Sequence, residues 1–302
     1  GVQASTCTAS GSYSTAMGDG TTASGDYSTS MGRSTAASAL YSTAMGRSTA
    51  ASALYSTAMG YGTDASGYFS TAMGSSTTAS ALYSTAMGDG TIASGSRSTA
   101  MGSYTTASDY ASLSIGRYNS VNSTVTAGGS ATSFDTDNAA FVIGNGTGSS
   151  TKSDAFVVYF NGNATLSGDL TINSDERLKD NIQPLGSTLN KLHQIEGKTY
   201  SFKKDEEHTP KIGVLAQEVQ AVFPELVTEG GDGILSVNYQ GLVPVLINAI
   251  NEQDAKMSEQ DAKMSEQEVK MSEQDAKIAA LEEMVRFLAV QQSQTTSSVA
   301  AN

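Results

Sequence analysis

Eight consecutive blocks of fourteen residues run from Ala9 to Ser120 without a slip, beginning ASGSYSTAMGDGTT, ASGDYSTSMGRSTA and ASALYSTAMGRSTA. The first seven blocks carry a Met at the same position, from Met17 to Met101, and Ile115 takes that position in the eighth. A fixed short period with a fixed apolar position is typical of a stacked solenoid, in which each block buries its face against its neighbours. The sequence therefore predicts an elongated repeat fold over residues 1–120.

Within each block, the run Tyr-Ser-Thr-Ala-Met-Gly is typical of a short β-strand. Alternation along this strand places Tyr13, Thr15 and Met17 on one side and Ala16 on the other. We interpret the Met column as the core of the roll. A second short run over residues 21–25 predicts a return strand, so that two short strands in each coil make a parallel β-roll.

Composition and charge exclude several classes of function. The formal net charge is -13, most of it in the C-terminal part, which argues against a nucleic-acid groove because phosphate binding needs clustered Lys and Arg. Cys7 is the single cysteine, so an intrachain disulfide is not expected. The chain has no run of about 20 apolar residues, so we expect no membrane insertion. Sequence upstream of Gly1 must be allowed for.

The repeat unit resembles the head of trimeric autotransporter adhesins of the YadA type. That family repeats a fourteen-residue unit of the form S-V-A-I-G-x-x-S-x-A-x-G, and this chain reads S-T-A-M-G-x-x-T-x-A-S-G over about residues 9–120. The resemblance implies a left-handed parallel β-roll in an intertwined homotrimer. It implies nothing about a ligand.

The repeat dissolves after residue 120. Residues 121–173 contain strand-like runs at 141–146 and 155–160, a hairpin signal at Asn161-Gly162 and a further strand-like run at 165–172, which together predict a β-rich connector. Residues 174–250 have the composition of an ordinary mixed α and β domain. There we expect a helix over 216–223 that stops before Pro224, and a strand over 234–239. The predicted fold is therefore mainly β with an α+β C-terminal domain.

From Val243 the sequence predicts a coiled coil, which with a polar tail makes up residues 251–302. With Pro244 in the first turn of the helix, apolar residues recur every seven positions. Lys256 would meet Asp261 of a parallel neighbour, and we interpret the run of Gln in the second seam as a register device. The first seam holds Val243, Ile250, Met257, Met264, Met271, Ile278 and Val285, and the second holds Leu246, Gln253, Gln260, Gln267, Gln274, Leu281 and Leu288.

The motif that carries chemistry is the run Asn173-Ser174-Asp175-Glu176-Arg177-Leu178-Lys179, with Ile-Gly-Val-Leu-Ala-Gln-Glu-Val downstream at 212–219. Together they resemble the C-terminal intramolecular chaperone of endosialidases and phage tail proteins, in which S-D-x-R-x-K-x-x-I precedes I-G-x-x-A-Q-E-V. Members of that family are trimeric, assist assembly of the preceding fibre and cut themselves off at the motif Ser. The resemblance implies that Ser174 is the nucleophile, Lys179 its base and Asn173–Ser174 the scissile bond. Asp175, Arg177, Gln217 and Glu218 are the supporting residues.

A Ser-Lys dyad needs a Lys whose pKa is lowered by burial or by nearby positive charge, which Arg177 could supply. Residues five apart lie about 140° apart around a straight helix, so Ser174 must precede the helix or the Lys must come from a neighbouring chain. The same residues would also suit an ordinary helix start, with Ser174 as the N-cap and acids in the first turn. The downstream Ala-Gln-Glu block favours the chaperone interpretation.

The predicted function is a homotrimeric viral, in particular phage, tail fibre or spike with a self-cleaving C-terminal chaperone, located in the virion. The alternative is a bacterial cell-surface adhesin, which would require a membrane anchor that the polar end of the chain does not encode. A glycan hydrolase lacks paired carboxylates in the roll, and an ice-binding surface is a further alternative. The Tyr column could bind a host receptor or glycan, or it could pack in the core or a trimer interface. We expect no cofactor and no metal: His193 and His208 lack partner ligands, and Gly-Asp-Gly occurs in only two blocks.

Overall fold

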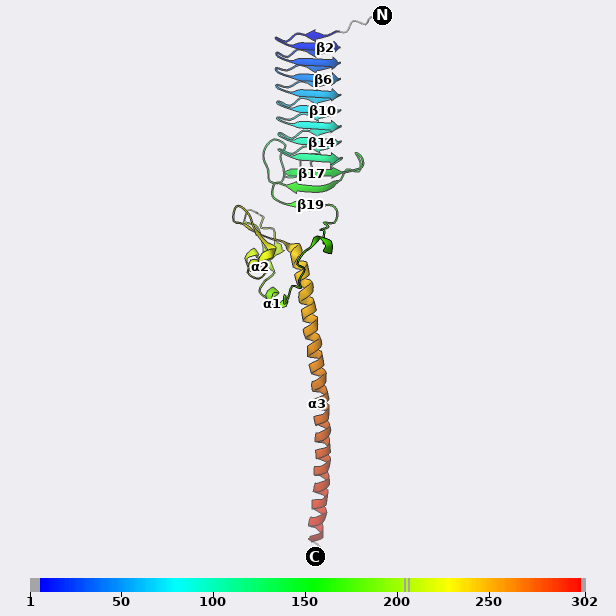
Figure 1. Ribbon diagram of the computed structural model, residues 1–302, viewed down its shortest axis with the longest axis vertical. Helices are drawn as coiled ribbons and strands as arrows, with labels where there is room; N and C mark the ends of the chain where they lie inside the picture. The colour runs from blue at the N-terminus through cyan, green and yellow to red at the C-terminus, as the bar shows by residue number, and fades with distance from the viewer. Residues whose placement is uncertain (1–5, 204, 206, 300–302) are drawn as a thin grey trace. The chain divides into compact units, whose positions relative to one another are not determined.

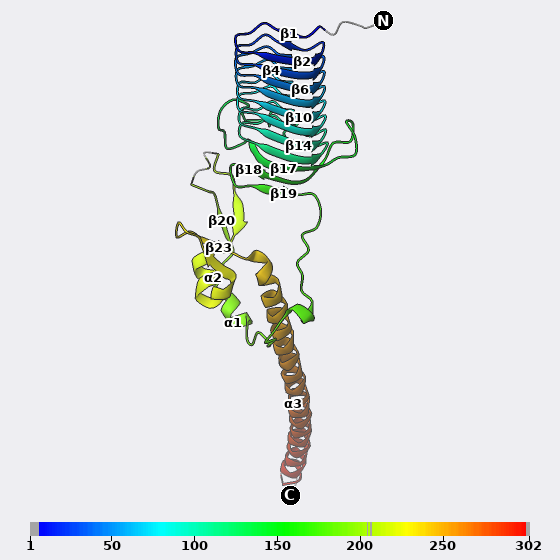
Figure 2. The same ribbon diagram turned by 45° about the horizontal axis from the view of Figure 1, so that its top comes forward.

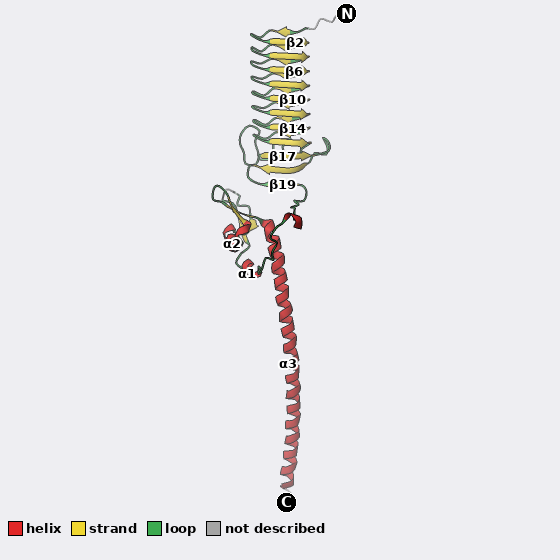
Figure 3. Cartoon of the chain, in the orientation of Figure 1, coloured by secondary structure: helices red, strands yellow, loops and turns green. Residues whose placement is uncertain are grey.

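The computed structural model describes residues 6–203, 205 and 207–299, with the side chains of the last helix described up to residue 292. The chain divides into two compact units, Gly1–Asn173 and Ser174–Asn302. The described part of the first unit is built of strands and turns, whereas the helices lie in the second (Figure 3). The two units are described in turn below.

The first unit is dominated by a β-roll in which each coil contributes one five-residue strand and one two-residue strand. The long strands stack one above the next, as Figure 1 shows, and the turned view in Figure 2 shows the coils from above. The long strands are β2 (Thr15–Asp19), β4 (Thr29–Arg33), β6 (Thr43–Arg47), β8 (Thr57–Tyr61), β10 (Thr71–Ser75), β12 (Thr85–Asp89), β14 (Thr99–Ser103) and β16 (Leu113–Arg117). The short strands are β1 (Thr8–Ala9), β3 (Thr22–Ala23), β5 (Ala36–Ala37), β7 (Ala50–Ala51), β9 (Asp64–Ala65), β11 (Thr78–Ala79), β13 (Ile92–Ala93) and β15 (Thr106–Ala107).

From β1 to β16 all pairings are parallel, and each strand residue pairs with the residue fourteen positions away in the next coil. Met45, for example, lies beside Met59, and Ala37 lies beside Ala51. The short strands form an eight-stranded sheet, and the long strands belong to an eleven-stranded one. This arrangement confirms the predicted solenoid and its mainly β class. The left-handed winding and the intertwining of three chains stay predictions from the family resemblance.

The predicted position of the Met column is wrong. Alternation along the long strand is as expected, but the side that faces the interior carries Ala, not Met. Ala44, Ala58 and Ala72 are fully buried, whereas the Met residues lie on the outer face, half-buried or exposed. The interior is narrow because the two sheets of one coil lie close together, and files of Ala, Ser and Thr fill it. In this interior, the Ser42 hydroxyl donates a hydrogen bond to the Ala39 backbone carbonyl at 2.7 Å.

The aromatic column lies outside the roll, so its packing in the core is also excluded. Successive rings are stacked, with centroids 4.9 to 5.1 Å apart and planes within 6° to 18° of each other. Each of these residues has a positive φ between 55° and 59°, a conformation that is uncommon for bulky side chains. Because each ring covers the face of the next, the column presents mainly ring edges and hydroxyl groups. Its members are Tyr13, Tyr27, Tyr41, Tyr55, Phe69 and Tyr83.

The roll ends in a polar cap rather than in a ninth coil. The Asp109 carboxylate is fully buried and accepts hydrogen bonds from the Thr126 backbone, the Thr126 hydroxyl and the Ala139 backbone, at 2.6 to 2.8 Å. The buried Asn122 side chain accepts from the Ser108 and Asp109 backbone of the last coil, and the buried Asn138 side chain pairs with the Ser130 backbone of the connecting loop. Such an atypical last repeat is what a solenoid needs to close its open end.

The predicted connector continues the sheet of long strands. β17 (Ala139–Asn145) pairs in parallel with β16, and β18 (Asp154–Tyr159) and β19 (Ala164–Leu166) follow as antiparallel neighbours. The turn at Asn161-Gly162, where Gly162 has a φ of 90°, joins β18 to β19 and confirms the hairpin signal. The strand expected over 165–172 is shorter than predicted, because it ends at Leu166.

The second unit has a small core beside the start of a long helix. Its elements are η1 (Glu176–Leu178), α1 (Leu189–Leu192), β20 (Lys198–Tyr200), β21 (Lys211–Gly213), α2 (Ala216–Val222), η2 (Pro224–Leu226), β22 (Val227–Glu229), β23 (Leu235–Val237), η3 (Tyr239–Gly241) and α3 (Leu242–Val299). Val219 and Phe223 pack with Val245 to form the buried centre. The helix predicted over 216–223 is confirmed as α2, and the predicted strand over 234–239 is confirmed as the shorter β23.

The helix α3 begins one residue before the predicted start and places Pro244 in its first turn, where a missing N–H is tolerated. Its first turns have two apolar faces. Val245 and Ala249 are buried against the small core, whereas Val243, Leu246 and Ile250 are exposed on the other side. The exposed face continues along the helix as the predicted seam.

Candidate self-cleavage site

The candidate site lies on a single turn of 3-10 helix with extended backbone on both sides. Asp175 precedes the turn with φ -62° and ψ 135°, and its carboxylate caps the turn by accepting from the Arg177 backbone at 2.9 Å. Lys179 follows the turn in an extended conformation, and its N–H donates to the Glu176 carbonyl at 3.0 Å. The N-cap is therefore Asp175, and Ser174 lies before the turn.

This geometry brings the Ser174 and Lys179 side chains together within one chain. The Lys179 Nζ donates a hydrogen bond to Ser174 Oγ at 2.7 Å. A straight α-helix would hold residues five apart on different faces, but the extended backbone around the short turn lets the Lys side chain reach back. Of the two routes left open by the sequence, the described chain takes the one in which Ser174 precedes the helical turn.

Arg177 is engaged with Asp175 and does not act as a free positive charge beside Lys179. Its Nε and Nη2 donate to the two carboxylate oxygens at 3.0 and 2.7 Å. This bidentate pair holds the pKa of Asp175 below its usual value, with a smaller contribution from the charge of Lys179, and raises the pKa of Arg177. The Arg177 guanidinium is therefore directed at Asp175 in the single chain.

The candidate site is open to solvent in the single chain and lies in an apolar stretch. Ser174 and Lys179 are both exposed. Five large apolar side chains close to them in the sequence are between 49% and 70% exposed, which is unusual for so short a segment of a folded protein. They are Leu170, Ile172, Leu178, Ile182 and Leu185.

Gln217 and Glu218, the other supporting residues, lie on α2. Gln217 is exposed. Glu218 accepts from the Glu196 backbone at 3.0 Å and pairs with Lys198 at 3.1 Å, and these contacts lower the pKa of Glu218. These partners lie in β20 and in the segment just before it, so Glu218 connects β20 to α2. The polar contacts of Glu218 support the small core rather than the Ser-Lys pair.

The downstream motif at 212–219 has a structural explanation in the same core. Val219 is fully buried, and a Cβ at Gly213 would lie 2.6 Å from the Tyr239 hydroxyl, so a larger residue there would displace the Tyr239 side chain. The same hydroxyl accepts from the Val214 backbone at 3.2 Å. The motif therefore builds the small core that holds the start of α3.

The sequence analysis missed Glu252, which connects α3 to the segment that follows the candidate site. Its carboxylate accepts from the Thr188 backbone at 2.6 Å and from the Ser187 hydroxyl at 2.9 Å, and these bonds lower its pKa. The neighbouring Asn248 donates to the Gly186 carbonyl at 2.7 Å. Glu252 occupies the same position of the seven-residue repeat as Glu259, so nothing in the repeat itself distinguishes it.

Comparisons with protein families match both units. Residues 174–228 match the model of a peptidase family described as the chaperone of endosialidase, and the match begins at Ser174. The roll matches the YadA head domain repeat in four consecutive segments, 9–35, 37–63, 65–91 and 93–119. The chain thus resembles YadA head repeats within residues 9–119 and the chaperone of endosialidase over residues 174–228.

Curated relatives are phage fibre proteins. The long tail fiber protein Gp37 of Escherichia phage AR1 is 39% identical over 97 residues, which are 30% of this chain and 9% of that protein. The protein of the same name from Salmonella phage S16 is 34% identical over 99 residues, 30% of this chain and 13% of its own length. A probable tail fiber protein of Escherichia phage Phieco32 is 34% identical over 90 residues, 28% and 12% respectively. The matched part is therefore about a tenth of each relative. In the described part of this chain, no helix is both long and apolar enough to cross a bilayer.

Proposed function

We propose that this chain is part of a homotrimeric phage tail fibre or spike, with the roll as shaft or receptor-facing surface and Ser174–Asn302 as an intramolecular chaperone. The fibre relatives and the chaperone match support this assignment. The bacterial adhesin alternative shares the head repeats, but it gives no account of the chaperone match.

The chaperone separates itself from the roll by cleaving the Asn173–Ser174 bond. The observation that carries this proposal is a coincidence of three boundaries: the Ser-Lys contact, the start of the chaperone match and the division between the compact units all fall at Ser174. Lys179 takes the hydroxyl proton as Ser174 Oγ attacks the Asn173 carbonyl carbon. The C–N bond breaks, the Ser174 amino group leaves with a proton, and water then hydrolyses the resulting ester.

Cleavage requires the assembled trimer, because a single chain leaves the dyad in water. An amine serves as a base near neutral pH only when burial or positive charge lowers its pKa, and the Arg177 charge is already paired with Asp175. The exposed apolar side chains on both sides of Ser174 are suited to contact with neighbouring chains. Those neighbours would exclude water from the dyad, so that cutting follows assembly.

The test is a denaturing gel and intact mass of freshly expressed full chain. The expected result is loss of the 31.1 kDa species and a C-terminal fragment that begins at Ser174. Ser174→Ala removes the nucleophile, and Lys179→Arg keeps the charge but cannot give up its proton near neutral pH. Both variants should stay intact while still forming trimers by light scattering, since neither touches the helix seam.

Other lysines provide the matched controls. Lys152→Arg, in the exposed part before β18, should cut at the normal rate. Lys191→Arg, Lys198→Arg and Lys211→Arg test three of the other lysines within the chaperone match. Cleavage that persists in Lys179→Arg, or that is lost only in one of these three, would assign the base to another group.

The outer surface of the roll provides two candidate contact faces. The Met file on the sheet of long strands is suited to the trimer interface, since it places a continuous row of half-buried or exposed apolar side chains on the outer face. The aromatic column from Tyr13 to Tyr83 is proposed as the surface that meets the host receptor or glycan. Replacing Tyr41 and Tyr55 with Ser should reduce binding to host cells while the light-scattering mass is unchanged.

A further inference from the structure

The middle of α3 is almost the same sequence four times, so it cannot by itself fix the alignment of neighbouring helices. EQDAKMS at 252–258 recurs unchanged at 259–265, followed by EQEVKMS and EQDAKIA. The contacts repeat as well: Lys263 pairs with Glu259 and Lys270 with Glu266, each at 2.6 Å. A helix shifted by seven residues along its neighbour would again place Met on Met and Gln on Gln. The Gln run, interpreted above as a register device, therefore cannot prevent this shift.

The charges beside the seam select direction but not alignment. Each Lys flanking the seam lies five residues before an acid on the opposite flank, which is the spacing of interchain pairs in a parallel coiled coil. An antiparallel partner would instead bring Lys to Lys. A shift of seven residues still places every Lys opposite an acid. The pairs are Lys256 with Asp261, Lys263 with Glu268, Lys270 with Asp275, and Lys277 with Glu282.

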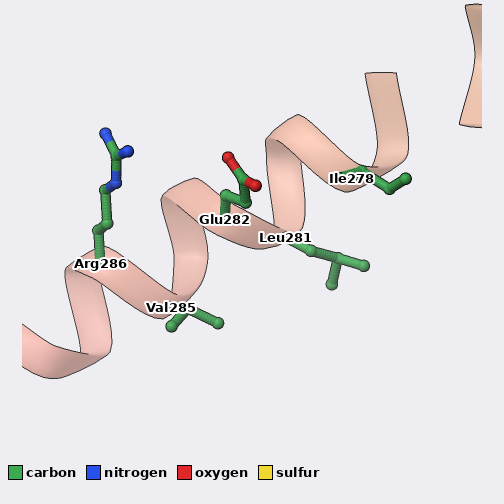
Figure 4. A pocket seen from close by; sticks show the side chains of 5 residues that line it. All are labelled: Ile278, Leu281, Glu282, Val285 and Arg286. Carbon is green, nitrogen blue, oxygen red and sulfur yellow. The ribbon is translucent and has the colours of Figure 1, made fainter. Parts of the chain in front are cut away.

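The seam changes character at its C-terminal end. Ile278, Leu281, Val285 and Leu288 are four successive apolar seam residues without an intervening Gln, and we call them the C-terminal clasp. They are between 54% and 64% exposed in the single chain. Figure 4 shows Ile278, Leu281 and Val285 projecting from one side of α3, with Glu282 and Arg286 on the other, around a shallow apolar groove.

We propose that the C-terminal clasp, packed against the same residues of two further copies of this chain, sets the alignment of the three helices. In the correct alignment each Leu281 meets Leu281 of its neighbours. In a helix shifted by seven residues, Leu281 faces Gln274, which buries an amide against an apolar surface. The occupant of the groove is therefore a second copy, since the charge pattern and the apolar pattern are both complementary to themselves in parallel. This inference rests on the trimer of the proposed function.

Disulfide trapping tests the alignment directly in the full chain. Two versions that carry Cys7→Ser, one with Gln267→Cys and one with Gln274→Cys, are co-expressed with different tags. In correct alignment the two cysteines are about 10.5 Å apart along the helix axis, beyond the reach of a disulfide of about 7 Å between Cα atoms. A shift of seven residues brings them to the same level. The share of disulfides between the two versions therefore measures the misaligned fraction.

With the native clasp, we expect almost all disulfides within each version. Adding Leu281→Gln and Leu288→Gln extends the uniform repeat, and the mixed disulfide should rise several-fold. A control pair, Met264→Gln and Met271→Gln, also replaces two apolar seam residues with Gln but keeps the clasp, so its mixed disulfide should stay low. Adding Gln260→Leu to the clasp variant places one apolar layer among the Gln layers of the seam. Because a shift of seven residues would then bring the introduced Leu against Gln, the mixed disulfide should fall again.

The outcomes separate this inference from the proposed function. If native chains give no trimer by light scattering, the proposed function fails. If trimers form but the mixed disulfide stays at its native level in the clasp variant, alignment is set elsewhere and the inference is wrong. A rise as large in the Met control also overturns it, because general weakening would then suffice. If the double clasp variant does not assemble, Leu281→Gln alone provides the same comparison.

Discussion

Changing Gly60 to Ala should separate two neighbouring coils of the roll. Gly60 has a φ of 125°, and a Cβ built there would lie 1.9 Å from the Gly74 carbonyl oxygen of the next coil. The shortest usual contact between such atoms is about 3.3 Å, so the coils must move apart by about 1.4 Å. The bond from the Ser76 amide to the Tyr61 carbonyl, now 2.7 Å, would then be broken.

The expected cost follows from these changes. A side chain at this φ is strained by about 1 to 3 kcal/mol, and each lost hydrogen bond adds about 1 kcal/mol. With two or three bonds lost between β8 and β10, the free energy of unfolding should fall by about 3 to 6 kcal/mol per chain. Gly62 provides a matched control in the same coil. Its φ is 62°, a Cβ there would meet nothing closer than the Ser76 Oγ at 3.7 Å, and Gly62→Ala should cost about 1 kcal/mol.

Urea denaturation followed by circular dichroism, together with hydrogen exchange, measures the difference. Because solenoid coils interact only with their neighbours, the Gly60 variant should also exchange the Ser76 and Asp64 amides much faster while distant coils keep their protection. If the two Ala variants unfold within about 1 kcal/mol of each other, the distance-based argument fails. In that case the coils would have enough freedom to accept the methyl group.

Three further predictions address the interior, a carboxylate in the roll and the second unit. Ala44→Asp places an unpaired charge in the interior and should lower the unfolding free energy by about 3 to 5 kcal/mol, which thermal melts would detect. Met45→Asp, on the outer face, should leave the coil folded and weaken only the association between copies, which light scattering would detect. Burial raises the pKa of Asp64 above 3.8, so folding is disfavoured as pH rises through the raised value. Asp64→Ala, which introduces the residue found at this position in the preceding coil (Ala50), should raise the melting temperature at pH 7 and lose its advantage below about pH 3.8. Hydrogen bonds, first from the Thr188 backbone, hold the pKa of Glu252 below 4.5, so its stabilisation is complete above that pH and is lost as pH falls through the lower folded value. Glu252→Gln should remove this acid sensitivity from exchange rates at residues 186–189.

Repetition made the fold of the roll predictable, but it did not reveal which face is inside. A strict fourteen-residue period leaves little besides stacked coils, and alternation correctly separated Ala16 from Met17. Choosing the interior by hydrophobicity failed because the two sheets of one coil are too close for Met. The wider, more apolar side chain lies outside, where a neighbouring copy can cover it. The width of the interior is a property of the coil as a whole, which alternation along one strand does not encode.

The candidate site was predictable in its residues and only partly in its geometry. The motif named Ser174 and Lys179, and the difficulty of joining them on a straight helix was apparent from their spacing. The Asp175–Arg177 pair was not anticipated, because a sequence does not show which of several neighbouring charges will pair. Glu252 was hidden for a different reason. It shares its repeat position with three other Glu residues, and only the fold of residues 186–189 distinguishes it.

Neither repetitive part of the chain, the roll or the middle of α3, fixes the alignment of neighbouring chains by itself. The non-repeating segments between and beyond them provide that alignment. A coil of the roll packs on any other coil almost as well, since the interior files of Ala, Ser and Thr are the same in each. The middle of α3 likewise makes the same contacts after a shift of seven residues. Aligning the helices first, at the clasp, would hold three chains at equal height before any coil pairs, so that each roll starts from the same coil. Once the rolls are closed, their stacked contacts no longer depend on the helices. A cut at Ser174, on the boundary between the units, would then release the chaperone without undoing the alignment it established.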